Sequence, residues 1–208
     1  FTMAQALEIG STALGGGYDA THPIRVSRSW IRDYHAKQRW LSTPEIFIYS
    51  SNIGAAKMAL DIGGARQRAF MGQLGMLSRT PLQLHEVASP LVPRVWRSVN
   101  TMTIAYGYGI SVSPVQLAAG VAAVINGGIF YPPTLIKRSA GEDIVGTHVL
   151  SPATSEKMRR LLRLAVVKGT GKSANANGYM VGGKTGTAEK VSGRRYRRKS
   201  LISSFVAA

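Results

Sequence analysis

The chain has 208 residues, of which 45% are hydrophobic, and its 26 Lys and Arg against 10 Asp and Glu give a net charge of +16. This hydrophobic content excludes a disordered chain and is sufficient for one sizeable core. The absence of cysteine excludes disulfides and thiolate metal sites, and the four histidines lack the spacing of metal ligands. We therefore predict a globular chain without a metal or other cofactor. The positive charge favours anionic partners such as acidic polymers, nucleic acid or lipid headgroups.

Apolar periodicity and helix-capping residues predict the elements of the chain in order. The predicted helices are Phe1–Leu14, Ser42–Tyr49, Ile53–Leu60, Gly64–Leu77, Pro114–Ile125 and Pro152–Val167. Short strands or extended connections are predicted at Ile24–Val26, Ile129–Ile136 and Ile144–Leu150. No segment has the roughly 20 consecutive apolar residues that a membrane span needs.

Three of these helices have N-terminal signals, and one of them is the cap Ser151-Pro152 before the helix that ends at about Val167. Ser42-Thr43-Pro44-Glu45 is a capping box, S-x-x-E, with proline in the first turn. Ser113 followed by proline is a second cap, and it opens a helix in which nearly every residue is apolar. We therefore predict that this helix, Pro114–Ile125, is buried.

The stretch that bears most chemical information is Gly178–Lys190, GYMVGGKTGTAEK. Apolar residues precede its polar centre and a second apolar run, Leu201–Ala208, follows, which is typical of a β-hairpin. One strand edge then carries Lys184, Thr185, Gly186 and Thr187. The lysine supplies positive charge, the threonine hydroxyls suit a carboxylate, and the glycine lets another backbone approach closely. The alternative is a polar strand end without a function.

The same stretch also satisfies the phosphate-loop pattern G-x-x-x-x-G-K-T between Gly178 and Thr185. A phosphate loop needs an apolar strand before it and a helix directly after the Lys-Thr pair. Here Asn175 and Asn177 precede the pattern, and glycine-containing sequence that disfavours a helix follows it. The context therefore argues against nucleotide binding.

The densest basic cluster is Arg194–Lys199, which we place in the loop of the hairpin. It is either a solvated loop or a surface that contacts anionic lipid or polymer. A polyanion-binding module is the corresponding alternative for the whole chain. DNA binding that shows no sequence preference and disappears at moderate salt would reflect only non-specific electrostatic attraction.

Ser50 and Asn52 lie two residues apart between two predicted helices. On a regular helix they would point away from each other, whereas in an extended or turn conformation they can point the same way. If both act on one ligand, the helix must break at this point. The alternative is two polar residues on a helix surface.

The order and spacing of these motifs resemble a known set. Penicillin-binding proteins and serine β-lactamases carry S-x-x-K, then S-x-N, then K-T-G. Here Ser50-Ser51-Asn52 precedes Lys184-Thr185-Gly186 by about 130 residues. Longer sequence segments around the motifs strengthen the match. They are TPEIFIYSSNIG at 43–54, YGYGISVSPVQLA at 106–118, NGG at 126–128 and VGGKTGTA at 181–188. They resemble class B penicillin-binding proteins, especially the division-type D,D-transpeptidase.

One departure from the family pattern concerns the nucleophile. No S-x-x-K occurs in the 208 residues. In the family, a segment like that at Phe1–Glu8 directly follows the lysine of this motif. We therefore expect a fragment, residues 1–208 of a partial transpeptidase domain, with the nucleophilic serine just before Phe1. This chain alone is then expected to be inactive.

The resemblance implies a serine acyl-enzyme mechanism, with these residues in named roles. Ser50 would relay a proton to the leaving amine, and Asn52 would hold the peptide amide of the substrate. Lys184 would act electrostatically on this hydroxyl network. Thr185 and Thr187 would bind the terminal carboxylate, and the backbone N–H of Thr187 would contribute to the oxyanion hole. Gly186 would keep the strand edge open for a substrate that lies alongside as an added strand.

The resemblance also implies a fold, a location and partners. The fold would be the α/β (α+β) penicillin-binding and serine β-lactamase-like transpeptidase fold, an antiparallel sheet with helices on both sides. The catalytic domain would act in the periplasm, held at the bacterial inner membrane by an N-terminal anchor. The expected partners are peptidoglycan stem peptides ending in D-Ala-D-Ala, β-lactam antibiotics, and division proteins including a lipid-II polymerase, but no nucleic acid.

Three alternatives share this fold. An elongation-type transpeptidase would catalyse the same reaction. The sequence SSNIG favours the division type over the elongation type. A β-lactamase would hydrolyse its acyl-enzyme quickly. A non-catalytic penicillin-binding sensor domain would keep the fold, and an intact S-x-x-K would count against it.

Overall fold

The computed structural model describes residues 1–139, 141–192 and 195–208. Its helices are α1 (Thr2–Glu8), α2 (Thr43–Ile48), α3 (Asn52–Ile62), α4 (Gly64–Gln73), α5 (Ser98–Ile104), α6 (Pro114–Ile125), α7 (Pro152–Val167) and the 3-10 helix η1 (Lys172–Ala174). Its strands are β1 (Gly17–Asp19), β2 (Ile24–Val26), β3 (Ser29–Ile31), β4 (Trp40–Ser42), β5 (Ile129–Phe130), β6 (Thr147–His148), β7 (Gly183–Ser192) and β8 (Arg195–Ala207). In these described ranges, the strand pairs β1–β4, β2–β3, β5–β6 and β7–β8 are antiparallel.

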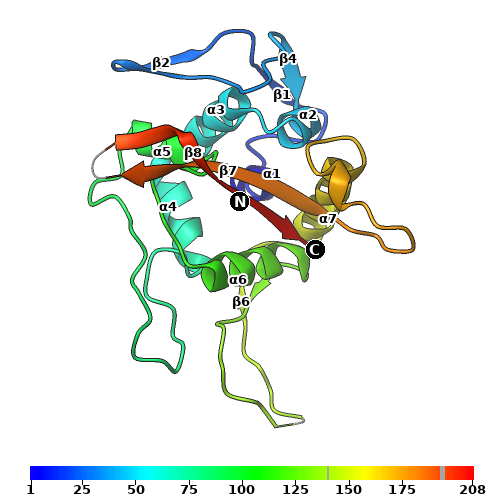
Figure 1. Cartoon of the computed structure of the whole chain (residues 1–208). Coiled ribbons are helices and arrows are strands. Elements are labelled where there is room, and N and C mark those ends of the chain that lie inside the picture. Colours follow the sequence, from blue (N-terminus) through cyan, green and yellow to red (C-terminus); the bar gives the residue numbers. More distant parts are fainter. Residues whose placement is uncertain (140, 193–194) are drawn as a thin grey trace.

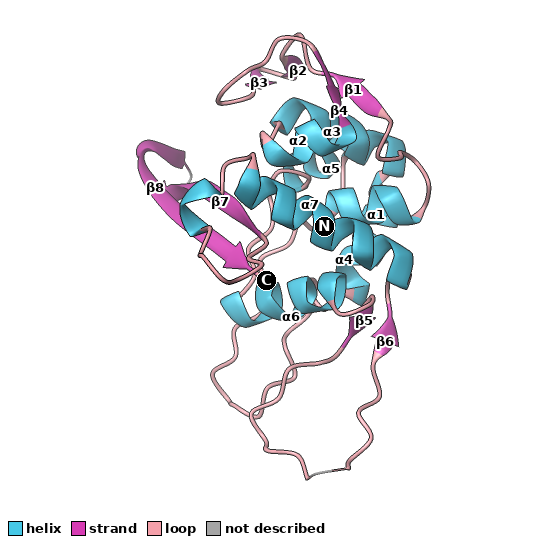
Figure 2. Cartoon of the chain, turned by 90° about the vertical axis from the view of Figure 1, so that its right-hand side faces the viewer, coloured by secondary structure: helices cyan, strands magenta, loops and turns pink. Residues whose placement is uncertain are grey.

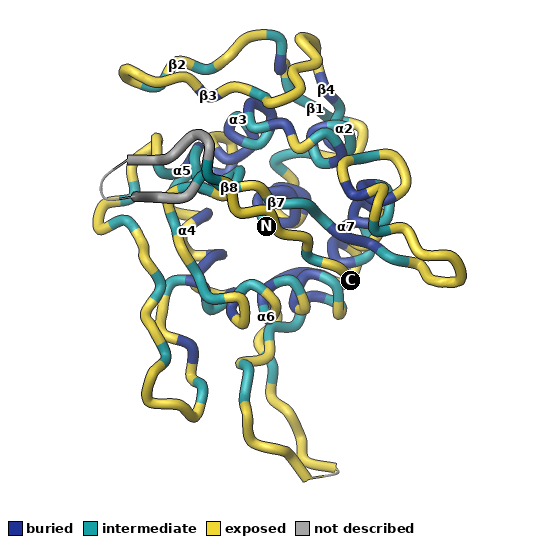
Figure 3. The backbone as a smooth tube through the Cα atoms, viewed as in Figure 1, coloured by how far each residue is buried: buried dark blue, intermediate teal, exposed yellow. Residues whose placement is uncertain are grey.

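Helix α1 forms the centre of the core. Residues 2–7 are all buried, and the helix packs against α3, α4 and α7. Figure 1 shows α1 behind the long β7–β8 hairpin, and Figure 3 shows buried residues gathered in this central group of helices. The core is therefore helical, and the hairpin lies across it.

The capping predictions are confirmed. In α2, the hydroxyl of Ser42 accepts the N–H of Glu45 while the glutamate carboxylate accepts the N–H of Ser42. Helix α6 begins with the same reciprocal arrangement between Ser113 and Gln116. Each of these helix starts depends on hydrogen bonds between residues only three apart. The local sequence is therefore enough to specify them.

The first predicted helix is too long. Helix α1 ends at Glu8, because Gly10 takes a left-handed conformation with φ of 70°. The N–H of Ser11 then donates to the carbonyl of Ala6, which closes the helix end. The predicted helix Gly64–Leu77 likewise stops at Gln73, just before Gly75 with φ of 68°.

The prediction that the apolar helix α6 is buried is only partly correct. One stripe, which includes Gln116, Gly120 and Ala123, is buried, whereas Val115 remains 41% exposed. Helix α6 packs mainly against α7 and β5. In the described part of the chain no second layer covers its outer face, so the apolar residues there stay accessible.

The hairpin prediction is confirmed, but its bounds differ. Strand β7 begins at Gly183 rather than Gly178, and Tyr179 and Met180 are exposed before it. Strand β8 already begins at Arg195, so most of the basic cluster belongs to a strand and not to the loop, while Arg194 lies outside the described residues. A register shift between Glu189 and Lys190 lets strand pairing continue beyond the expected loop.

The mixed α/β fold class is confirmed. The antiparallel sheet at the centre of the described part consists of β7 and β8 alone. In Figure 2, α1, α6 and α7 lie on the same side of this pair. None of the helices in the described ranges combines the length and hydrophobicity that a membrane span requires.

Candidate active site

The two sequence motifs meet in space at Ser50 and Lys184. Although 134 residues separate them, the Nζ of Lys184 donates a hydrogen bond of 2.8 Å to the Oγ of Ser50. The lysine comes from the second residue of β7, and the serine comes from the turn between α2 and α3. The structure thus builds a hydroxyl–amine pair from a turn and a strand edge.

The helix breaks at Ser50, as the shared-ligand interpretation requires. Ser50 has a left-handed φ of 56°, a conformation that costs a serine roughly 1–2 kcal/mol relative to the right-handed one. The N–H of Ser51 donates back to the carbonyl of Ile46 in α2. Ser51 then caps α3, because its Oγ accepts the N–H of Gly54 at 3.0 Å. The strained residue is therefore the one whose hydroxyl faces Lys184.

A short segment outside both motifs holds this turn. The carboxylate of Asp33 accepts the hydroxyl of Ser51 at 2.7 Å and the N–H of Ile53 at 2.9 Å. The Nδ2 of Asn52 donates to the carbonyl of Arg32 at 2.8 Å. Sequence reasoning missed this clamp, because the segment 18–41 has no regular pattern that would point to a partner 20 residues away.

Asn52 differs from the other motif residues in its surroundings. Its amide nitrogen is directed to the Arg32 carbonyl, and it is not among the residues around the cavity described below. By contrast, Lys184, Thr185 and Gly186 line both of the adjoining cavities described below, Thr187 lines the larger one and Ser50 the smaller one.

The environment of Lys184 alters its acidity. Burial lowers the pKa of this amine from 10.5 to about 8, because the interior disfavours the charged form. Besides Ser50, the Nζ also donates to the carbonyl of Thr185 at 3.1 Å. A lysine with this pKa is mostly protonated at pH 7 and loses its charge as the pH rises above about 8.

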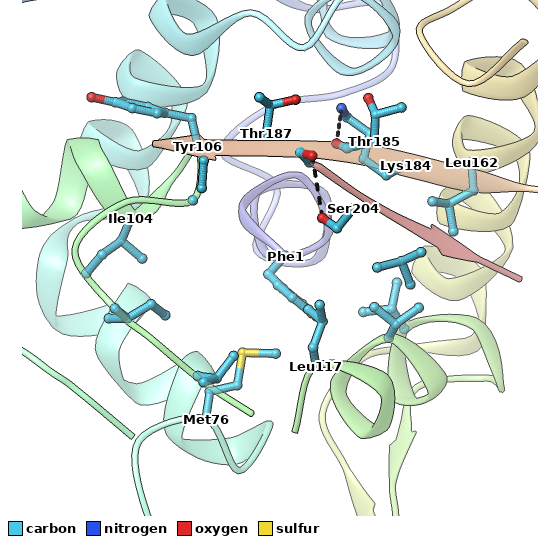
Figure 4. A pocket seen from close by; sticks show the side chains of 18 of the residues that line it. Phe1, Met76, Ile104, Tyr106, Leu117, Leu162, Lys184, Thr185, Thr187 and Ser204 are labelled. Carbon is cyan, nitrogen blue, oxygen red and sulfur yellow. Dashed lines mark hydrogen bonds between the residues drawn. The ribbon is translucent and has the colours of Figure 1, made fainter. Parts of the chain in front are cut away.

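A cavity of about 390 Å³ opens beneath the hairpin. Figure 4 shows Lys184, Thr185, Thr187 and Ser204 along one side of it and apolar side chains opposite. The apolar lining includes Phe1, Met76, Ile104, Leu117 and Leu162. An adjoining cavity of about 260 Å³ reaches Ser50 and Ser51 and shares Lys184, Thr185 and Gly186 with the first. The polar edge is thus suited to an anionic, hydrogen-bonding ligand that also has apolar groups.

Gly186 pairs with Ser204 across the hairpin. A Cβ added there would lie 2.7 Å from the Oγ of Ser204 across the hairpin. Within the described ranges, no group of three or more His, Asp or Glu side chains is arranged to hold a metal ion. The polar groups that line the site are hydroxyls, the Lys184 amine and the backbone of β7.

The comparison with family models decides the identity of this domain. Residues 1–208 match the model of the penicillin-binding protein transpeptidase domain. The chain belongs to this family. The resemblance drawn from the two motifs is thus confirmed.

Two curated relatives show the range of similarity. The domain is 38% identical to the probable peptidoglycan D,D-transpeptidase FtsI of Caulobacter vibrioides, over 100% of this chain and 36% of that protein. It is 32% identical to stage V sporulation protein D of Bacillus subtilis, over 86% of this chain and 29% of that protein. The chain thus spans about a third of the length of these relatives.

Solved structures agree in fold. The transpeptidase domain of penicillin-binding protein 3 from Burkholderia pseudomallei superposes with a TM-score of 0.91 at 30% identity, over 100% of this chain and 63% of that chain. Penicillin-binding protein 3 of Mycobacterium tuberculosis, solved with aztreonam, gives a TM-score of 0.89 at 23% identity, over 99% of this chain and 50% of that chain. The second similarity concerns the fold alone.

Proposed function

We propose that this domain is part of a serine-type peptidoglycan D,D-transpeptidase that cross-links stem peptides during septal cell-wall synthesis. The observation that carries the proposal is the 2.8 Å hydrogen bond between Lys184 and Ser50. It joins the S-x-N and K-T-G motifs in one site on the edge of an open strand. The similarity to a probable D,D-transpeptidase named FtsI supports the reaction and the septal role.

The reaction proceeds through two acyl transfers. The nucleophilic serine belongs to an S-x-x-K motif that precedes Phe1, and its lysine takes up the hydroxyl proton. The serine oxygen bonds to the carbonyl carbon of the penultimate D-Ala, and the bond to the terminal D-Ala nitrogen breaks. Ser50 passes a proton to that leaving amine. The amine of a neighbouring stem peptide then attacks the ester, forms the cross-link and releases the serine, which regains its proton.

The residues of the hairpin bind and polarise the substrate. Protonated Lys184 holds the Ser50 hydroxyl in place and attracts the terminal carboxylate, which Thr185 and Thr187 bind through their hydroxyls. The backbone N–H of Thr187 stabilises the oxyanion, and such a donor contributes roughly 3–4 kcal/mol. Gly186 leaves the edge open for the substrate backbone. For Asn52, whose amide nitrogen donates to the carbonyl of Arg32, the side-chain oxygen is the atom that would accept the peptide N–H of the substrate.

The location and partners follow from the same assignment. The catalytic domain works in the periplasm on a protein anchored in the inner membrane, and it cooperates with division proteins that include a lipid-II polymerase. β-Lactams acylate the same serine, in agreement with the family to which the domain belongs. The excess of positive charge suits an anionic wall or membrane environment.

The test is intact-mass spectrometry of the full-length protein after incubation with benzylpenicillin. We expect a stable adduct of one drug molecule on a serine shortly before Phe1. Rapid loss of the adduct with drug hydrolysis would identify a β-lactamase instead. A folded protein with neither adduct nor hydrolysis would contradict the proposal and leave a non-catalytic domain.

A further inference from the structure

A residue outside both motifs touches the proposed carboxylate site. The Oγ1 of Thr170 lies 2.6 Å from the Oγ1 of Thr185, a hydrogen bond in which either hydroxyl can be the donor. Thr170 lies in the short connection between α7 and η1, 15 residues before Thr185. The motif patterns did not single it out, because the contact arises only when this connection lies next to β7.

The backbone fixes this connection on both sides of Thr170. The N–H groups of Gly169 and Gly171 both donate to the carbonyl of Ala165, each at 3.1 Å. One carbonyl in the last turn of α7 therefore holds the two neighbours of the threonine. The position of the Thr170 backbone is set by these bonds and does not depend on its own side chain.

The two glycines allow this connection to approach its neighbours closely. A Cβ on Gly169 would lie 2.6 Å from the carbonyl oxygen of Ile48 at the end of α2. A Cβ on Gly171 would lie 3.2 Å from the ring of Phe205. Phe205 is the residue that pairs with Thr185 across the hairpin. The connection thus contacts the strand pair at the level of Thr185.

We infer that Thr170 is a positioning residue for the carboxylate site and orients the hydroxyl of Thr185 toward the substrate. This inference rests on the proposed function. A hydroxyl has one donor proton and two acceptor lone pairs. If Thr170 donates to Thr185, the Thr185 proton is free to point at a carboxylate, and the chain of two hydroxyls strengthens both bonds. Thr170 contacts the substrate only through Thr185.

The variants for the test are Thr170→Val, which has the same shape without the hydroxyl, and Thr170→Ser, which keeps it. Ser173→Ala removes an exposed hydroxyl from the adjacent η1 and serves as the matched control. The full-length protein is acylated with benzylpenicillin and with its methyl ester, in which the carboxylate is blocked. For each variant, the second-order rate constants and the thermal midpoint are measured.

We expect Thr170→Val to slow acylation by benzylpenicillin roughly tenfold, the loss of one neutral hydrogen bond, while the rate with the ester changes little. Thr170→Ser and Ser173→Ala should keep the wild-type ratio of the two rates. An unchanged ratio in Thr170→Val would overturn the inference, as would an equal loss with both probes and a lowered thermal midpoint. Wild-type protein that forms no adduct would overturn the proposed function itself.

Discussion

Ser50 and Lys184 come from two regions that are held in place in different ways. The turn of Ser50 is fixed by the end of α2, the cap of α3 and the carboxylate of Asp33. The strand of Lys184 is held mainly by β8, whose Leu201 and Phe205 are 52% and 38% exposed. The N–H of Glu189 adds one bond to the hydroxyl of Tyr108. The strained part of the site is thus the well-supported part, and the hairpin provides the accessible edge.

This contrast has a physical reason. A left-handed serine persists only where the surroundings over-determine its conformation, and three separate contacts do so here. A strand edge that receives a substrate must instead leave backbone groups unpaired and reachable. The two regions can be tested separately, because a change in the strand should affect chemistry and a change in the clamp should affect both chemistry and stability.

The largest effect is expected for Lys184→Ala in the full-length protein. Loss of the charge and of the bond to Ser50 should slow acylation by benzylpenicillin on the order of 10³-fold. The fold should stay intact, because the residue lies on a strand edge, so far-UV circular dichroism should match that of the wild type. An unchanged acylation rate would refute the site assignment.

The next largest effect is expected at Asp33, whose carboxylate holds the turn of Ser50. Asp33→Ala leaves the hydroxyl of Ser51 and the N–H of Ile53 without their acceptor, which should lower the free energy of unfolding by about 2 kcal/mol. Because the turn loosens, acylation should slow roughly 10- to 100-fold. Denaturant unfolding and stopped-flow acylation measure the two effects.

Asp33→Asn serves as the control for this prediction. It keeps an acceptor oxygen and should lose less in both measurements. If Asp33→Ala lowered neither stability nor rate, the turn would not depend on this clamp.

The pH dependence separates the lysine from the turn. Lys184 has a pKa of about 8, lowered by burial, so its charge is present below that pH and lost above it. Since the proposed role needs the charged form, the second-order acylation rate should fall about tenfold for each pH unit well above 8. Lys184→Arg should be slower but lose this alkaline limb, because arginine stays charged. A wild-type profile that is flat to pH 10 would exclude a role for the lysine charge.

The smallest effect is expected at the capping box that starts α2. A hydrogen bond from Arg39, followed by one from the N–H of Ser42, lowers the pKa of Glu45 to about 2. A depressed carboxyl pKa stabilises the fold above the unfolded value of about 4.5, and this contribution is lost as the pH falls toward 2. Glu45→Gln should cost less than about 1 kcal/mol at pH 7. The difference from wild type in denaturant unfolding should vanish near pH 2, and a constant difference would contradict the assignment.

The sequence predicts what depends on neighbouring residues. The caps at Ser42 and Ser113 and the hairpin that carries Lys184 follow from patterns only a few residues long. The end of the first helix at Glu8 was missed because a single left-handed glycine outweighed the periodicity. The sequence predicts the basic cluster in the hairpin loop and not in a strand, because the register shift after Glu189 has no sequence signal.

The candidate site shows the same limit. Ser50 and Lys184 were found through their motifs, and their contact was expected from resemblance rather than from any local pattern. Asp33 and Thr170 lie in irregular segments, and each acquires its role only through a partner 15 or more residues away. Such contacts depend on tertiary packing, which a pattern of hydrophobicity and caps does not encode.

The central claim is that Ser50 and Lys184 act as one unit in acyl transfer. The most direct measurement is a double-mutant cycle of Ser50→Ala and Lys184→Ala, read as the rate of acylation by benzylpenicillin in the full-length protein. Residues that act as a unit are strongly non-additive, so the double variant should be within about threefold of the slower single variant. Losses that multiply, as for independent sites, would contradict the account.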